Sequence, residues 1–487
     1  VIVGGSATTP TSLTIVEPQL AIIKNVANLS NAGNPPRAGD VLRYTLALTA
    51  VGTGAGDNFS DAFDLRIEDS LGLALAYQTG TVTVNGAGNT ITDPVISGDG
   101  STTPQTLVWD LASATADIDV AEGATVTITY DVLVLDSVLA NQDLSNSAVA
   151  RWTGLDGVDA NERNGTGTPA VNDYFTAPVT TTLTTPDNTA LNKTRLTDTY
   201  GAADDLVRIG DIIEYELRAT LEEGRYSNLV FADTLPQGMT FAGVVSINGD
   251  TTLPFNAVSP FVHADITSPV ITGDPVSGPS SVTFNLGEVT NISDNNAAND
   301  EFVIVYRVRL LDNVFAQVNS TTLTNNAQLS YDSGAGTVSL TDTVSVTLLQ
   351  PALSVAKTAV AAGGDTVIEA NELVTYTVDV TNSGLTPAYD LLLEDTIPVG
   401  MRNGAATVTV LSTSLLGAGT VLPNPVTNYN AATGRASWNM ASGIADAYSI
   451  PVGETLRLVY QVQADANLGA GLTLTNAAVA RRYYSFD

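Results

Sequence analysis

Lysine occurs only three times in the 487-residue chain, and each lysine is followed by an aspartate and then an asparagine at a similar distance. The spacing from lysine to aspartate is 45, 40 and 38 residues, and from aspartate to asparagine it is 77, 92 and 81 residues. An amine, a carboxyl group and a carboxamide are the groups from which an assisted amide crosslink can be made. The candidate sets, in chain order, are Lys24, Asp69 and Asn146; Lys193, Asp233 and Asn325; and Lys357, Asp395 and Asn476.

These side chains can react with one another if the fold buries them together. Burial disfavours charge, so it drives a lysine towards its neutral amine and an aspartate towards its neutral acid. The amine can then attack the asparagine carboxamide, which the acid polarises through a hydrogen bond, and ammonia leaves. The product is an intramolecular isopeptide crosslink, formed once and without turnover. The alternative is a lysine paired by charge with the aspartate, beside an asparagine that satisfies a buried backbone group.

The segments around these residues repeat three times, which indicates three homologous units. Tyr44, Tyr215 and Tyr376 stand in register, 19 to 22 residues after the lysines. Further repeated segments are LVWDL, VTFNL and ASWNM, followed by TYDVLV, VYRVRL and VYQVQA. We expect an N-terminal arm and three domains, here named units 1, 2 and 3, with the spans 1–18 for the arm and 19–186, 187–351 and 352–487 for the units.

Short alternating runs separated by Gly, Pro, Asn and Asp turns predict an all-β chain of sandwich domains. Neighbouring side chains in a strand point to opposite faces, so parity decides which residues face the core. Lysine shares parity with apolar residues in LAIIKNV and LSVAKTA, as aspartate does in LRIED, LVFAD and LLLED and asparagine in LSNSA, LTNNA and LTNAA. The pattern is less clear for Lys193, because Arg195 is in phase with it. We therefore expect all three polar residue types to point into the core.

The order of these motifs resembles the tandem conserved-repeat domains of bacterial surface proteins. The resemblance rests on the lysine strand followed by YTVDVTNSG, LEDTIPVGM and LTNAAV, and it covers nearly the whole chain. Those domains are in turn similar to the isopeptide-forming domains of Gram-positive fimbrial shafts. The resemblance implies an immunoglobulin-like sandwich and, in the crosslinked members, a bond from lysine to asparagine that an acidic residue assists.

A segment with the pattern of a closing strand precedes unit 1. TPTSLTIVEP ends at Pro18 as TAPVTTTLTTP and DTVSVTLLQP end units 1 and 2, whereas unit 3 has only 11 residues after Asn476. We expect the arm to enter unit 3 of a neighbouring identical subunit. Such a head-to-tail contact does not close on itself, so it builds an extracellular filament. The expected donor residues are Ser12, Leu13, Thr14, Ile15 and Val16.

Two other interpretations fit the same pattern. The sequence would also have a spare strand at one end if it were a slice of a longer tandem-repeat surface protein. Alternatively, the repeats form the stalk of a cell-surface adhesin, and long inserts such as Asn248 to Pro279 bind a receptor or glycan.

Composition excludes several classes of function. The net charge of −32 leaves no basic patch for nucleic acid, and no apolar run approaches the roughly 18 to 20 residues that span a bilayer. We expect no enzymatic activity, because cysteine is absent and the single histidine, His263, falls in a predicted loop. We also expect no cofactor: the acidic loops 156–167 and 293–301 could hold Ca2+, but solvated turns explain them better.

Overall fold

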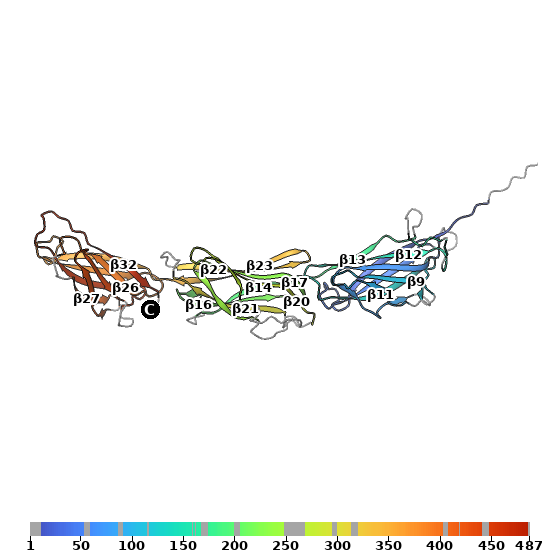
Figure 1. The fold of residues 1–487 in the computed structure, drawn as a ribbon, viewed down its shortest axis with the longest axis horizontal. Coiled ribbons are helices and arrows are strands. Elements are labelled where there is room, and N and C mark those ends of the chain that lie inside the picture. Colours follow the sequence, from blue (N-terminus) through green and yellow to red (C-terminus); the bar gives the residue numbers. More distant parts are fainter. Residues whose placement is uncertain are drawn as a thin grey trace, which may run out of the picture.

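The computed structural model of the chain is a row of β-sandwiches drawn out along one axis, with an extended N-terminal arm projecting from one end (Figure 1). Every regular element in the described residues is a β-strand, and none of these residues forms a helix that could cross a bilayer. The prediction of an all-β chain with immunoglobulin-like sandwiches is confirmed. The described residues are 11–52, 59–85, 91–113, 116–157, 159–160, 162–166, 174–198, 205–247, 268–294, 300–312, 320–402, 408–417, 419–440 and 448–485.

Unit 1 consists of two facing sheets. Its strands are β2 (Leu20–Asn28), β3 (Val41–Ala50), β5 (Phe63–Leu71), β6 (Leu75–Tyr77), β7 (Thr83–Asn85), β8 (Val95–Ser97), β9 (Thr106–Ser113), β10 (Ala116–Asp117), β11 (Thr125–Val134), β12 (Asp143–Thr153) and β13 (Val179–Thr184). One sheet has the order β2-β3-β11-β6, with β7 also paired to β11. The other has the order β10-β9-β5-β12-β13, with β8 also paired to β9.

Unit 2 repeats this arrangement. Its strands are β14 (Ala190–Asp198), β15 (Leu206–Val207), β16 (Ile212–Thr220), β17 (Gly224–Leu235), β18 (Met239–Ile247), β19 (Val270–Gly273), β20 (Ser280–Asn291), β21 (Glu301–Leu310), β22 (Ser320–Ser333) and β23 (Gly336–Leu349). The two sheets have the orders β14-β16-β21-β18 and β15-β23-β22-β17-β20-β19.

Unit 3 has the same two layers. Its strands are β24 (Leu353–Ala361), β25 (Leu373–Asn382), β26 (Tyr389–Thr396), β27 (Thr409–Leu415), β28 (Thr420–Leu422), β29 (Thr427–Asn430), β30 (Arg435–Asn439), β31 (Thr455–Gln463) and β32 (Ala477–Tyr484). The sheets have the orders β24-β25-β31-β27-β28 and β29-β30-β26-β32.

Alternation along these strands produces three separate hydrophobic cores. The buried apolar residues run from Leu20 to Tyr174, from Val207 to Leu348 and from Val374 to Val462. A tyrosine of the central strand packs against another aromatic ring in each core, which is a tryptophan in units 1 and 3 and a phenylalanine in unit 2. The pairs, with the distance between ring centres, are Tyr130 and Trp109 (5.2 Å), Tyr306 and Phe284 (6.2 Å), and Tyr460 and Trp438 (4.9 Å). The three cores fall within the three predicted spans, whose boundaries stay predictions.

A left-handed residue precedes each site aspartate by five positions. Asp64, Asn228 and Asp390 have φ values of 50°, 53° and 52°. The pairing of β17 and of β26 with its neighbours shifts register next to this residue. Asp and Asn reach the left-handed region more readily than other residues with a β-carbon. A left-handed residue with a register shift beside it therefore recurs near the start of all three aspartate strands.

The units differ at one edge of the sandwich. In unit 1 the closing strand β13 pairs along β12, and in unit 2 the closing strand β23 pairs along β22. Each closing strand also contacts the lysine strand of the facing sheet, β2 or β14. In unit 3 the strand β32, which is the counterpart of β12 and β22, pairs with β26 and itself contacts the lysine strand β24, and no described residue pairs with its outer edge. The sandwich of unit 3 is therefore open where the other two are closed.

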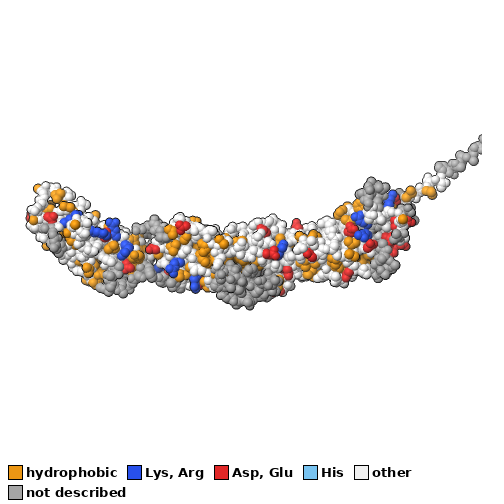
Figure 2. All heavy atoms as spheres, viewed as in Figure 1, with side chains coloured by type: hydrophobic (Ala, Val, Ile, Leu, Met, Phe, Trp, Pro, Cys, Tyr) orange, Lys and Arg blue, Asp and Glu red, His pale blue; other side chains and the backbone are white. Residues whose placement is uncertain are grey.

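The N-terminal arm extends from the far end of unit 1 (Figure 1). Residues 11–16 form no strand and are all exposed, with Leu13 at 92% and Ile15 at 83%, and hydrophobic side chains are visible along the arm in Figure 2. The base of the arm is fixed, because strand β1 (Glu17–Pro18) pairs in parallel with β4 (Phe59–Ser60). Among the described residues of the arm, only 11–16 stand away from unit 1.

Candidate functional site

The structure brings the lysine, aspartate and asparagine of each set together between the two sheets. The lysines lie on β2, β14 and β24 of one sheet, and the aspartates on β5, β17 and β26 of the other. The asparagines lie on β12 and β22 and, in unit 3, directly before β32. Ion pairs join Lys24 to Asp69, Lys193 to Asp233 and Lys357 to Asp395. Parity along the strands thus placed all nine side chains on the correct face.

A tyrosine that the sequence analysis did not assign to the site links these groups. Its hydroxyl donates a hydrogen bond to the carboxylate and accepts one from lysine Nζ and one from asparagine Nδ2. The distances from Nζ to the hydroxyl are 3.1, 2.8 and 2.8 Å, and those from Nδ2 are 3.0, 3.3 and 3.3 Å. The tyrosines are Tyr130, Tyr306 and Tyr460, on β11, β21 and β31.

This hydroxyl uses its whole hydrogen-bonding capacity, which is one hydrogen and two lone pairs. The attacking amine and the nitrogen that would leave therefore contact the same oxygen in every unit. We call the four residues of each unit the buried tetrad. The tyrosine recurs at one place in TYDVLV, VYRVRL and VYQVQA, and this recurrence was the sequence signal for it.

Burial controls the protonation of the tetrads. The side chains of Lys24 and Lys193 are 1% and 0% exposed. Loss of hydration lowers the pKa of Lys24 to about 8 and that of Lys357 to about 8, although the neighbouring carboxylate opposes the shift, and burial lowers the pKa of Lys193 for the same reason. Burial also raises the pKa of Asp69, against the charge of Lys24. Both directions favour a neutral amine beside a neutral acid.

Two oxygens of the first tetrad accept no hydrogen bond from any described residue. These are Asp69 Oδ1 and Asn146 Oδ1, and both are buried. Buried acceptors without a hydrogen-bond donor are rare, so we expect a donor hydrogen between or beside these two oxygens. A proton on the Asp69 carboxyl would supply a donor for the asparagine carbonyl, and this is the polarisation that attack by the amine requires.

The other two tetrads differ in which of these oxygens accept a hydrogen bond. In unit 3, Asp395 Oδ1 and Asn476 Oδ1 also accept no hydrogen bond within the described part of the chain. In unit 2, both oxygens of Asp233 accept hydrogen bonds, and only Asn325 Oδ1 is left without a donor. The geometry of units 1 and 3 therefore suits the crosslinking chemistry better than that of unit 2.

The tyrosines that the sequence placed in register lie on the other side of each lysine. Lysine Nζ stands over the rings of Tyr44, Tyr215 and Tyr376, at 5.1, 4.8 and 4.5 Å from the ring centres. An aromatic face stabilises a cation. This contact favours the ion-pair interpretation, whereas the loss of hydration favours the neutral amine.

The open edge of unit 3 is a second candidate site. Leu474, Ala478 and Ala480 are only partly buried there. Their counterparts under the closing strand of unit 1 are fully buried; these are Leu144, Ala148 and Ala150. The side chain of Lys357 is 12% exposed, more than either other lysine. The edge therefore presents an unpaired backbone and a partly open core together.

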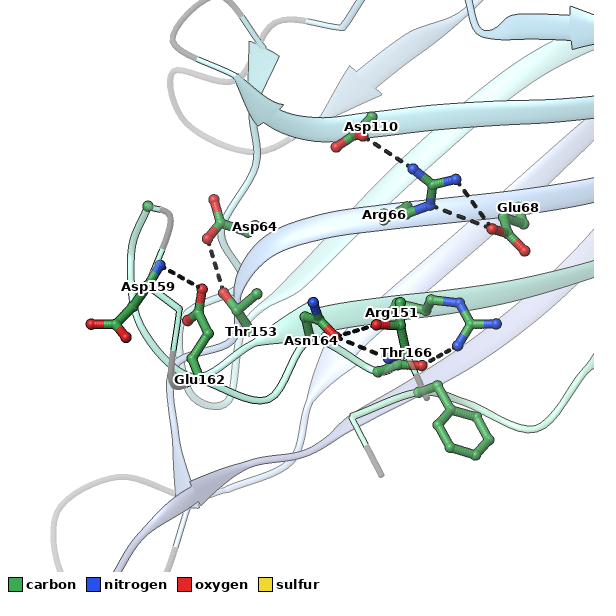
Figure 3. Close-up of a pocket in the computed structure, with 13 residues that line it drawn as sticks. Asp64, Arg66, Glu68, Asp110, Arg151, Thr153, Asp159, Glu162, Asn164 and Thr166 are labelled. Carbon is green, nitrogen blue, oxygen red and sulfur yellow. Dashed lines mark hydrogen bonds and ion pairs between the residues drawn. The ribbon is translucent and has the colours of Figure 1, made fainter. Parts of the chain in front are cut away.

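A surface pocket of about 660 Å³ on unit 1 is the place where an adhesin function would be sought (Figure 3). Both arginines that line it have partners within the protein: Arg66 pairs with Glu68 and Asp110, and Arg151 donates to the carbonyl of Gly165. The pocket therefore singles out no class of ligand.

The remaining predicted features add no site. Asp156 of the first acidic loop has carboxylate oxygens within 4.8 Å of those of Asp117 and Asp119. Acidic groups on a surface often gather without an ion, so this cluster by itself defines no calcium site. His263, part of the insert 248–279 and residues 295–299 of the second acidic loop lie outside the described residues.

The fold and the tetrads together define a chain of immunoglobulin-like β-sandwich repeats. Among solved structures, the chain is similar to the C-terminal domain of the antigen I/II polypeptide BspA of Streptococcus agalactiae, with 13% identity, a TM-score of 0.34, and 59% of this chain and 94% of that chain covered. The C-terminal domain of the antigen I/II-family protein AspA of Streptococcus pyogenes gives 13% identity, a TM-score of 0.34, and coverage of 59% and 93%.

A third similar structure is the 35 kDa C-terminal fragment of the major pilin GBS80 of Streptococcus agalactiae. It gives 13% identity, a TM-score of 0.23, and coverage of 66% of this chain and 91% of that chain. The three structures are parts of bacterial surface antigens and of a pilin. No protein-family model matches the chain, and no curated protein matches it.

Proposed function

We propose that the chain is the structural subunit of an extracellular filament, joined head to tail by donor-strand exchange. The observation that carries the proposal is the unpaired outer edge of β32, together with an exposed arm at the opposite end of the molecule (Figure 1). Residues 11–16 of one copy pair with residues 471–476 of the next, the segment that leads directly into β32. Because donor and acceptor lie at opposite ends, the contact repeats without closing.

The closing strand of unit 2 supplies the expected register. Val346 stands five residues before its closing proline and lies opposite Leu323. Leu13 also stands five residues before its proline, and in both segments the next lysine follows that proline by six residues. Leu13 therefore takes the place of Val346 and lies opposite Leu474, with Ile15 on the same face two residues later.

Exchange satisfies both surfaces at once. No strand in the described part of the chain pairs with residues 471–476 or with the outer edge of β32, and an added strand can pair there. The apolar side chains of the arm enter the partly open core of unit 3. The acidic coat, with 51 Asp and Glu against 19 Lys and Arg, keeps a long fibre soluble in a saline extracellular setting.

We also propose that the tetrads form amide crosslinks. The first lysine proton passes to the aspartate, and the neutral Nζ attacks asparagine Cγ. The aspartic acid then gives a proton to Nδ2 and takes a second one from Nζ, the Cγ–Nδ2 bond breaks, and ammonia departs, leaving Nζ with the single hydrogen of the amide and the aspartate protonated. The tyrosine hydroxyl holds the attacking and the leaving nitrogen. The new bond joins the first strand of a unit to the asparagine segment of the facing sheet, so tension along the filament passes through a covalent link.

Introduced cysteines test the strand contact, because the chain has none of its own. Residues directly opposite on paired strands have Cβ atoms about 4.5–5.5 Å apart, close enough for a disulfide after a small adjustment. The full chain with Leu13→Cys and Leu474→Cys is expected to give a ladder of disulfide-linked oligomers on oxidation. The control pairs Ser12→Cys with Leu474→Cys and places the first thiol on the other face, so it should give no ladder.

Two results would refute donor-strand exchange. One is the absence of a ladder from the matched pair while the control behaves identically. The other is negative-stain images in which a chain lacking residues 1–16 forms filaments of normal length. Intact mass tests the crosslinks separately, since each one removes one ammonia, about 17 Da.

A further inference from the structure

The three tetrads are not equally enclosed, and the difference follows the closing strand. Asn146 lies within β12, where its backbone stands opposite Thr181 of β13. Asn325 lies within β22, opposite Val344 of β23. Both asparagines are fully buried. In units 1 and 2, the closing strand therefore pairs with the asparagine segment and also contacts the lysine strand.

Asn476 lacks this support. It precedes β32, lies in no strand, and is only partly buried. Its Nδ2 still donates to the hydroxyl of Tyr460 at 3.3 Å, and Lys357 still pairs with Asp395. The four groups of the third tetrad are thus assembled, but at an edge that water reaches.

We infer that insertion of a neighbour's arm completes the third tetrad and triggers its crosslink, so that unit 3 locks only after it has been joined. The inference rests on the proposed function, because it takes residues 11–16 of a second copy as the missing strand. In the register of unit 2, Thr11 of the arm stands opposite Asn476, as Val344 stands opposite Asn325. The arm then also lies along β24, as β23 lies along β14.

Positioning, not the basicity of the amine, separates the third tetrad from the first. The pKa of Lys357 is lowered by burial to about 8, as is that of Lys24. What differs is the hold on the carboxamide and the exclusion of water. A misplacement of about 1 Å costs roughly a hundredfold in the rate of a reaction between positioned groups, so fixing Asn476 in a paired strand is expected to matter by at least that factor.

The bond made is Lys357 Nζ to Asn476 Cγ, the bond broken is Cγ–Nδ2, and ammonia is the leaving group. Lys357 Nζ gives up two protons, of which Asp395 relays one to Nδ2 and keeps the other, so no external reactant is needed. The new amide joins Lys357 of β24 to Asn476, the residue directly before β32. In the proposed arrangement the inserted arm contacts both of these segments. The arm could then leave only if unit 3 opened while these two segments stayed covalently joined. Assembly would therefore be irreversible.

The test compares the full chain in filaments with a full-chain variant that cannot donate, Leu13→Asp with Ile15→Asp. Peptide mapping by mass spectrometry measures the Lys357–Asn476 link in each, and Asn476→Ala filaments are the control for its identity. We expect the link in filaments and its absence from the unassembled variant. A peptide of residues 11–18 added to that variant should speed the link at least about a hundredfold over the same peptide with both aspartates.

Each other outcome overturns the inference. Formation of the link in the unassembled variant as fast as in filaments, or its absence from filaments, contradicts it directly. Binding of a labelled peptide without the link also contradicts it, but leaves donor-strand exchange intact. Failure of the wild-type chain to form filaments, together with failure to bind the peptide, overturns the proposed function and this inference with it.

Discussion

Replacing the two apolar residues of the arm by aspartate should abolish filament assembly. Leu13 and Ile15 are 92% and 83% exposed, whereas their counterparts Val346 and Leu348 in unit 2 are 1% and 0% exposed. Moving a Leu or Ile side chain from water into a core stabilises by about 1.5–3 kcal/mol, so the two together contribute about 3–6 kcal/mol. At about 1.4 kcal/mol for each tenfold change, their loss raises the dissociation constant by roughly 10² to 10⁴.

The matched control places the same two charges on the other face of the arm. Ser12→Asp with Thr14→Asp changes the net charge equally but leaves Leu13 and Ile15 in place. Sedimentation and negative-stain length distributions at a range of subunit concentrations measure the effect. The reasoning is refuted if both double variants assemble like the wild type, or if both lose assembly to the same extent, since only burial of one face separates them.

Three further predictions concern single units and use thermal or denaturant unfolding of the full chain unless another measurement is named. Asp69→Ala should prevent the ammonia loss of unit 1 and, by leaving Lys24 buried without its partner, destabilise that unit by about 3–5 kcal/mol; an unchanged intact-mass deficit would contradict the assigned role. Tyr130→Phe removes an acceptor from two buried nitrogens and should cost about 1–3 kcal/mol for each, whereas Tyr77→Phe, whose hydroxyl bonds to the exposed Asp93, should cost much less. Equal losses in these two variants would argue against the tetrad. Asn228→Ala should be about 1–2 kcal/mol less stable than Asn228→Gly, because both lose the side chain but only alanine strains the left-handed backbone; equal stabilities would show that no strain is relieved there.

Much of the candidate site could be predicted from the chain because parity along a strand is a local property. Each lysine, aspartate and asparagine sits in a short alternating segment, and a period of two assigns it to a face without knowledge of the fold. The prediction was weakest at Lys193, where Arg195 shares its phase. The structure nevertheless buries Lys193 fully, within 2.8 Å of the hydroxyl of Tyr306.

The tyrosine hydroxyls could not be assigned in this way. Tyr130 lies 106 residues after Lys24 and 16 before Asn146, and only the strand order places its side chain between them. Its recurrence in the three copies was visible, but recurrence is equally expected of a residue that only packs in the core. The left-handed bulge before each aspartate was also hidden, because Asp and Asn occur in many turns without it.

By itself, the sequence determined the three repeats, the inward face of the tetrad residues, and the arm with the pattern of a closing strand, because periodicity and spacing are properties of the chain. The tertiary structure alone decided which hydroxyl joins the amine to the carboxamide, that β32 has an unpaired edge among the described residues, and that the third tetrad is the one open to water. These three features depend on which strands become neighbours and on which edge of each sandwich has a closing strand. Contacts between sheets are set by packing across the core, which no local pattern encodes.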